Sequence, residues 1–101
     1  MKVNIRDKDG NTALIWAADK GHHKIVKRML TMENTDVNIQ NNEGFSALLC
    51  AAEQGYSETV KEILARDDTV VTHVDDHGVD AVSAAKNNGH AEVVEMLFSY
   101  V

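Results

Sequence analysis

The segment GNTALIWAADKG, residues 10–21, recurs as GFSALLCAAEQG at residues 44–55 and as GVDAVSAAKNNG at residues 78–89. The copies are separated by 34 residues each time, without insertion or deletion. A fixed period of this length is typical of stacked supersecondary units, each of which buries its apolar face against its neighbours. We therefore predict one domain, 1–101, with three repeats at about 6–39, 40–73 and 74–101.

Local signals indicate a first helix in each copy. Thr12, Ser46 and Asp80 each precede an alanine-rich segment, and their side-chain oxygens can cap a helix N-terminus. About two turns later a glycine follows in every copy, at positions 21, 55 and 89. Glycine favours the left-handed conformation that ends helices, so each first helix is predicted to end there.

A second helix and an extended loop complete the unit. Apolar residues recur at helical spacing in residues 22–30, 57–64 and 91–98, opposite a charged face. The segments 36–44 and 71–78 place Asn or Asp residues beside a glycine, a pattern typical of a tight, hairpin-like turn. The predicted fold class is an all-α repeat solenoid of helix-turn-helix units joined by hairpin-like loops.

Composition excludes several classes of protein. No apolar run approaches the roughly 20 residues needed to cross a bilayer, and the start MKVNIRDKDG has no signal-peptide apolar region. We therefore expect a soluble, intracellular protein, cytoplasmic or nuclear, without membrane contact. Cys50 is the single cysteine, within LLCAAE, and we interpret it as a buried hydrophobe rather than a nucleophile.

These repeats resemble the ankyrin family, whose signature is Thr-Pro-Leu-His-x-Ala at a period near 33. The matching segments are TALIWAA at 12–18, SALLCAA at 46–52 and DAVSAAK at 80–86. They are followed by GHHKIV, GYSETV and GHAEVV, in which the glycine precedes the second helix. Alanine replaces the family's proline in all three copies, and Ile15, Leu49 and Ser83 replace its histidine. The resemblance implies a scaffold that binds another protein through a concave face, with no catalysis, cofactor or metal.

Carrying over the family's usual contact positions gives a predicted partner-binding surface. Its residues are Lys8, Asp9, Asn11, Asp19, Lys20, Asn42, Glu43, Phe45, Glu53, Gln54, Asp76, His77, Val79, Asn87 and Asn88. Phe45 lies in the central repeat, and Asn11 and Val79 occupy the equivalent position, or column, in the other copies. We expect it either to anchor a partner with an apolar pocket flanked by Lys or Arg, or to pack over its own turn.

Charge is distributed unevenly along the array. The net charge is +3 over residues 1–33, −3 over residues 34–66 and −6 over residues 67–101. Lys24 with Glu58, and Arg28 with Glu62, are expected to pair between stacked second helices. Because the only basic segment is HHKIVKR, nucleic-acid binding is disfavoured. The chain is expected to be a monomer, with weak head-to-tail association as an alternative, in which the basic first repeat stacks on the acidic third.

The ends of the array differ. Ser83 and Lys86 replace apolar residues of the earlier copies, so the third repeat is predicted to form a polar cap. Val3 and Asn4 match the closing phrase of a repeat, which favours the hypothesis that the chain is the C-terminal part of a longer array.

Several residues admit a second interpretation. Asn38 resembles the asparagine that is hydroxylated in ankyrin proteins, which makes a modification substrate an alternative function. His73 and His77 flank Asp75 and Asp76, but their spacing suits a helix and they fall in a loop, so metal binding is disfavoured.

We expect the other histidines and the tryptophan to have structural or solvent-exposed roles. His22 and His90 are expected to tie the turns between helices, and His23 is expected to be solvated. Trp16 is interpreted as core filler. A hydrolase that would use Cys50 or Ser83 with a histidine is disfavoured, because both positions lie on inner helices.

Overall fold

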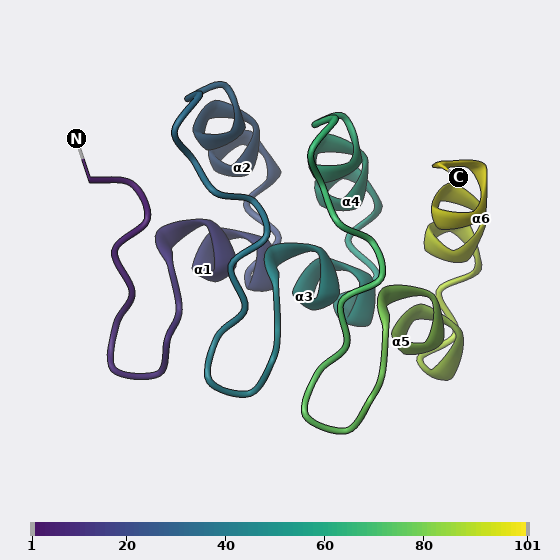
Figure 1. The fold of residues 1–101 in the computed structure, drawn as a ribbon. Helices are drawn as coiled ribbons and strands as arrows, with labels where there is room; N and C mark the ends of the chain where they lie inside the picture. The colour runs from purple at the N-terminus through teal and green to yellow at the C-terminus, as the bar shows by residue number, and fades with distance from the viewer. Residues whose placement is uncertain (1, 101) are drawn as a thin grey trace.

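The computed structural model describes residues 2–100, which form six α-helices in three pairs. The first helices of the pairs lie in one row, the second helices lie in a parallel row, and the connecting loops project beyond the first row (Figure 1). The described residues contain no strand. The all-α repeat solenoid predicted from the period is confirmed. The helices are α1 Ala13–Asp19, α2 His23–Leu30, α3 Ala47–Gln54, α4 Ser57–Leu64, α5 Ala81–Asn87 and α6 Ala91–Tyr100.

The predicted N-terminal caps are present on all three first helices. The backbone N–H of Ile15 donates to Thr12 Oγ1 at 3.2 Å, and the N–H of Leu49 donates to Ser46 Oγ at 3.2 Å. Asp80 Oδ1 accepts in the same way from the N–H of Ser83 in α5 at 2.8 Å. These oxygens satisfy backbone donors that have no partner within the helix, so each first helix begins at the same place in its repeat.

Glycine ends each first helix because the chain there adopts a left-handed conformation. The φ angle of Gly55 is 76°, and a Cβ at this position would collide with the imidazole of His90 in the next repeat. The position therefore excludes a side chain on both conformational and steric grounds. The ring of His90 is held there by Nε2, which lies 3.0 Å from the carbonyl oxygen of Glu53.

The loops between repeats form the predicted hairpin-like turns. In the central loop, the N–H of Asn41 donates to the carbonyl of Phe45 at 2.8 Å, and Asn41 Oδ1 accepts from the N–H groups of Glu43 and Phe45, each at 2.9 Å. Asp7 and Asp75 make equivalent contacts in the other copies. These Asx contacts fix the shape of the loop tips on the first-helix side.

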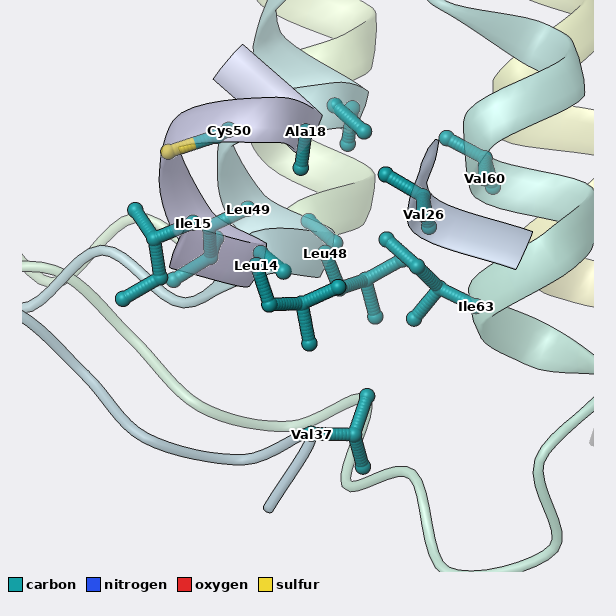
Figure 2. Close-up of a cluster of buried hydrophobic side chains, with 14 of the residues drawn as sticks. Leu14, Ile15, Ala18, Val26, Val37, Leu48, Leu49, Cys50, Val60 and Ile63 are labelled. Carbon is teal, nitrogen blue, oxygen red and sulfur yellow. The ribbon is translucent and has the colours of Figure 1, made fainter. Parts of the chain in front are cut away.

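The core runs between the two rows of helices. Leu14 and Leu48 from the first helices lie toward Val26 and Ile63 from the second helices, with Val37 of a loop below them (Figure 2). These five side chains are at most 2% exposed. The alanines of the first helices, all buried except Ala13, let α3 approach both α1 and α5 closely. The core cluster combines side chains from neighbouring repeats, so the stability of each repeat depends on stacking.

We call the junction of repeats 1 and 2 the first seam, and the junction of repeats 2 and 3 the second seam. The predicted ion pairs of the first seam are wrong: Lys24 does not pair with Glu58, nor Arg28 with Glu62, and the ion pair found within residues 2–100 is Arg66–Asp68 at 2.9 Å. Exposed lysine and arginine side chains extend into water here, because pairing would restrict them for little gain.

Arginine and tyrosine side chains tie the repeats instead. Arg66 Nη1 donates to the carbonyl of Leu30 at 3.2 Å, and Nη2 donates to that of Thr35 at 3.0 Å. One period later, Tyr100 Oη donates to the carbonyl of Thr69 at 3.4 Å. The two side chains occupy the same repeat position and reach carbonyls that are also one period apart. Each therefore attaches its own repeat to the preceding one.

The two flanks of the array have different chemistry. Ile25 of repeat 1 is 51% exposed, whereas its counterparts Thr59 and Val93 are 1% exposed, because each of them faces a preceding repeat. At the other flank Ser83 and Lys86 are exposed, as the capping prediction requires. The polar residues of this flank lie on α5, whereas Phe98 of α6 is 62% exposed. No helix formed by residues 2–100 is both long and apolar enough to cross a bilayer.

Candidate functional site

A hollow of about 220 Å³ lies at the first seam, on the side of the first helices and loop tips. We call it the seam hollow. It is lined by Asn11, Ile15, Trp16, Asp19, Asn41, Glu43, Phe45, Cys50 and Glu53. Five of these residues belong to the partner-binding surface predicted from the sequence, so the fold brings together residues that are up to 42 positions apart in the chain. Two aromatic rings and three carboxylates therefore surround one concavity.

Trp16 is the main correction to the sequence-based interpretation. Its side chain is 49% exposed and is not core filler. The indole N–H donates to Asp7 Oδ2 at 3.0 Å, and Lys20 Nζ lies 5.7 Å from the ring centroid. The equivalent positions in the other repeats are the small residues Cys50 and Ala84, both buried. The larger indole extends past the helix pair to the loop tip, where it forms a wall of the seam hollow.

The contact with Trp16 also affects the charge of Asp7. The indole N–H and the backbone N–H of Asn11 both donate to this carboxylate, and they lower its pKa. Asp7 therefore stays ionised and holds the indole in one orientation at neutral pH. An aromatic surface held in one orientation loses little conformational entropy when a ligand packs against it.

Phe45 forms another wall of the hollow and also supports the fold. Phe45 is half-buried and packs against the core. Its backbone N–H is held by Asn41 in the loop tip. Phe45 thus presents part of its ring to the hollow from a fixed position.

The remaining lining is acidic. Asp19 and Glu53, both half-buried, occupy equivalent positions at the ends of α1 and α3, and Glu43 comes from the loop tip. The Cys50 thiol is 6% exposed, and its burial, followed by the charges of Asp19 and Glu53, raises its pKa to about 12. The prediction that Cys50 is a buried hydrophobe is confirmed, since a thiol with this pKa is protonated at neutral pH.

The other predicted contact residues lie around the hollow or farther along the same side. Lys20 covers Trp16, and Asn42 is held by the loop of the preceding repeat through its side-chain amide and Lys8 O at 3.1 Å. None of the predicted contact residues is buried. Those outside the hollow are Lys8, Asp9, Lys20, Asn42, Gln54, Asp76, His77, Val79, Asn87 and Asn88.

Asn38 has a structural function in this fold. Its Nδ2 donates to the carbonyl of Asp68 at 2.8 Å, and its Oδ1 accepts from the N–H of Val70 at 2.8 Å. Asn4 makes the equivalent pair of contacts one repeat earlier, with Asn34 and Asp36. The amide thus joins successive loops.

The histidines of the turns and loop tips differ in their contacts. His90 ties the turn of the preceding repeat as expected, whereas the side chain of His22 is exposed and makes no capping hydrogen bond. His73 is half-buried, and its Nδ1 has no hydrogen-bond partner. His77 is exposed at a loop tip.

The geometry defines a class of protein: a stack of three helix pairs with a hollow at the junction of the first two. A model of the ankyrin-repeat family, described as "Ankyrin repeats (3 copies)", matches residues 1–75 and 29–101. The chain belongs to the ankyrin-repeat family. A search of curated proteins found no match. Ankyrin repeats are generally protein–protein interaction modules and are typically non-catalytic.

Proposed function

We propose that the side formed by the first helices and loop tips binds a partner protein, and that the seam hollow receives a lysine or arginine side chain of that partner. The observation that carries this proposal is the lining of the hollow, which combines the aromatic residues Trp16 and Phe45 with the acidic residues Asp19, Glu43 and Glu53. Residues 1–101 would act as one interaction unit.

The chemistry of the hollow selects the kind of side chain. Lysine and arginine carry an apolar stem that can lie along aromatic rings and a cationic end that can reach carboxylates. A volume of about 220 Å³ is below the roughly 300–1,000 Å³ that is typical of pockets for drug-sized ligands. A single inserted side chain is therefore a better match than a small-molecule substrate. A partner that presents a basic side chain beside apolar contacts fits this surface.

Electrostatics also favour a basic partner. The chain has a net charge of −6, and the three carboxylates of the hollow lie on the proposed contact side. Complementary charge raises association rates in a salt-dependent manner. The second repeat contributes Glu43 and Glu53, and the third repeat has His77 and Asn87 at the corresponding positions. At these two positions repeat 2 supplies carboxylates to the first seam, and repeat 3 supplies none to the second.

A random peptide library selected against the protein tests the proposal. We expect the selected peptides to share a lysine or arginine at a fixed position, and we expect replacement of that residue by alanine to weaken binding at least about tenfold. Trp16→Ala and Glu53→Gln should weaken binding to a similar extent. Glu95→Gln, on the second-helix side, is the matched control and should bind as the parent does. Selected peptides without a fixed basic residue would contradict the proposal, as would equal effects of Glu53→Gln and Glu95→Gln.

Head-to-tail self-association is a second candidate, favoured by the apolar flank of repeat 1. Ile5 and Ile25 are 65% and 51% exposed there, and repeat 1 is basic while repeat 3 is acidic. An exposed apolar flank beside complementary charge is typical of association surfaces. Light scattering over a range of protein and salt concentrations tests this candidate. A mass that increases at high protein concentration and low salt would support it, and a constant monomer mass would exclude it.

A further inference from the structure

A second cluster of functional groups lies on the other side of the first seam, between second helices. His23 at the start of α2, with Glu58 and Glu62 of α4, brings one imidazole nitrogen and two carboxylate oxygens within 4.8 Å of one another. His23 and Glu62 are half-buried, and Glu58 is exposed. The sequence predicted a solvated His23, and the first seam places it beside two carboxylates instead.

We propose that His23, Glu58 and Glu62 form a binding site for a divalent transition metal, best matched by Zn²⁺, that joins repeats 1 and 2. One imidazole and two carboxylates are ligands that zinc accepts, and a fourth position would remain for water. Mg²⁺ and Ca²⁺ prefer oxygen ligands alone, and the imidazole disfavours them. The site is separate from the proposed contact side, because it is formed by second helices.

The helical geometry explains why the three groups converge. Glu58 and Glu62 are four residues apart, so they share one face of α4. α2 packs against α4, and His23 is its first residue, where the side chain is not crowded by a preceding turn. Tetrahedral zinc, with bonds of about 2.0–2.2 Å, needs ligand atoms roughly 3.3–3.6 Å apart. Rotation of the flexible glutamate side chains can bring the carboxylate oxygens to this distance from the imidazole nitrogen.

The carboxylates are available as ligands, because neither is engaged by a cation in residues 2–100. Lys24, Lys27 and Lys61 lie on the same two helices, yet none forms an ion pair with Glu58 or Glu62. These lysines reduce the negative potential at the site. The affinity for zinc therefore depends on direct ligation more than on long-range attraction.

The second seam provides an internal comparison. One period later, the positions of His23, Glu58 and Glu62 are occupied by Ser57, Glu92 and Met96, which keep one carboxylate and no imidazole. The two seams therefore have equivalent backbone positions, but only the first seam carries all three potential metal ligands. Glu92 is the natural control for Glu58.

Calorimetric titration of the metal-free full chain with Zn²⁺ tests the proposal. We expect saturable binding of one equivalent, weakened at least about tenfold in His23→Gln and Glu62→Gln and changed less than about twofold in His22→Gln and Glu92→Gln. Mg²⁺ in excess should not compete. Zn²⁺ should also raise the melting temperature of the parent and not that of His23→Gln.

Each alternative result overturns the proposal. If no saturable binding is observed, or if His22→Gln lowers the affinity as much as His23→Gln does, the cluster does not hold the metal. All four variants change surface or half-buried side chains, and circular dichroism before the titration verifies that they are folded. Failure here leaves the peptide-binding proposal untouched, because the seam hollow uses none of these residues.

Discussion

The attachment of repeat 2 to repeat 1 through Arg66 leads to a quantitative prediction. Arg66→Met keeps an apolar stem of similar length and removes the N–H donors that reach the carbonyls of Leu30 and Thr35. Hydrogen bonds from charged groups contribute about 1.5–3 kcal/mol each, and the carbonyls lose their partners in a half-buried setting. Since the Arg66 side chain is 19% exposed, water replaces part of what is lost. We expect a loss of about 2–3 kcal/mol in the free energy of unfolding.

Urea unfolding followed by far-UV circular dichroism measures this loss. The midpoint should fall while the slope stays constant, because the surface exposed on unfolding is unchanged. For a chain of this size the melting temperature should fall by about 8–24 °C. This is a large fraction of the stability of a small repeat array.

Asp68→Asn is the matched control for the ion pair. It removes the carboxylate that contacts Arg66 at 2.9 Å but leaves both inter-repeat hydrogen bonds. Asp68 is 57% exposed, so its contribution is screened and the loss should be less than half that of Arg66→Met. Equal losses in the two variants would refute the reasoning, since the ion pair alone would then account for the effect of Arg66.

Three further predictions concern the core and the loop tip. Ala51 is 0% exposed, so Ala51→Glu should cost more than about 3 kcal/mol and unfold the array as a unit; an unchanged melting temperature would contradict the repeat frame. Because the pKa of Cys50 is raised to about 12, a disulfide reagent at about pH 8 should modify the native thiol about 1,000-fold more slowly than the unfolded one. Native and unfolded rates within tenfold of each other would show an accessible thiol. The pKa of Asp7 is lowered from 3.8, mainly by the indole N–H of Trp16, so this carboxylate stabilises the fold above its unfolded pKa, and the contribution is lost as pH falls through the folded pKa. Trp16 fluorescence should show this loss as a step below about pH 3.8, and the step should be absent in Asp7→Asn.

The repeating elements could be predicted from the sequence because each depends on local chemistry. The oxygen that caps α3 and the glycine that ends it act within a few residues of their own positions, so Ser46 and Gly55 could be interpreted without a structure. The Asx turn at Asn41 is equally local. The 34-residue period then supplied the stacking order, since every copy must present its apolar face to the next.

The contacts between repeats could not be predicted in the same way. Arg66 and Tyr100 share a column with Met32, and three unlike residues gave no signal of a shared function. The expected pairing of Lys24 with Glu58 assumed that residues in one column face each other, yet the structure places Glu58 beside His23. Which long side chains meet across a seam depends on rotamers, and rotamers depend on neighbours that the period does not specify.

Trp16 shows a further limit of prediction from the 34-residue period. Its column holds Cys50 and Ala84, which are small enough to be buried, and averaging over the copies predicts a buried residue. The indole is too large for that space and lies over Asp7 instead. A residue that departs in size from its column is therefore a better guide to a surface feature than a conserved pattern within the column.

The two proposed sites follow the same rule, and their position has a physical reason. A stack of repeats keeps its core columns uniform, because every unit must fit two neighbours, and it leaves the exposed columns free to differ. Both sides of the first seam differ from those of the second seam. Trp16 lines one hollow with acidic residues on one side, and His23 lies beside Glu58 and Glu62 on the other. Residues that differ between repeats can form a site together at a seam, because a seam brings side chains from two repeats into contact and neither repeat supplies the whole site. Binding groups in an array of this kind should therefore be sought by comparing seams, rather than by comparing single repeats.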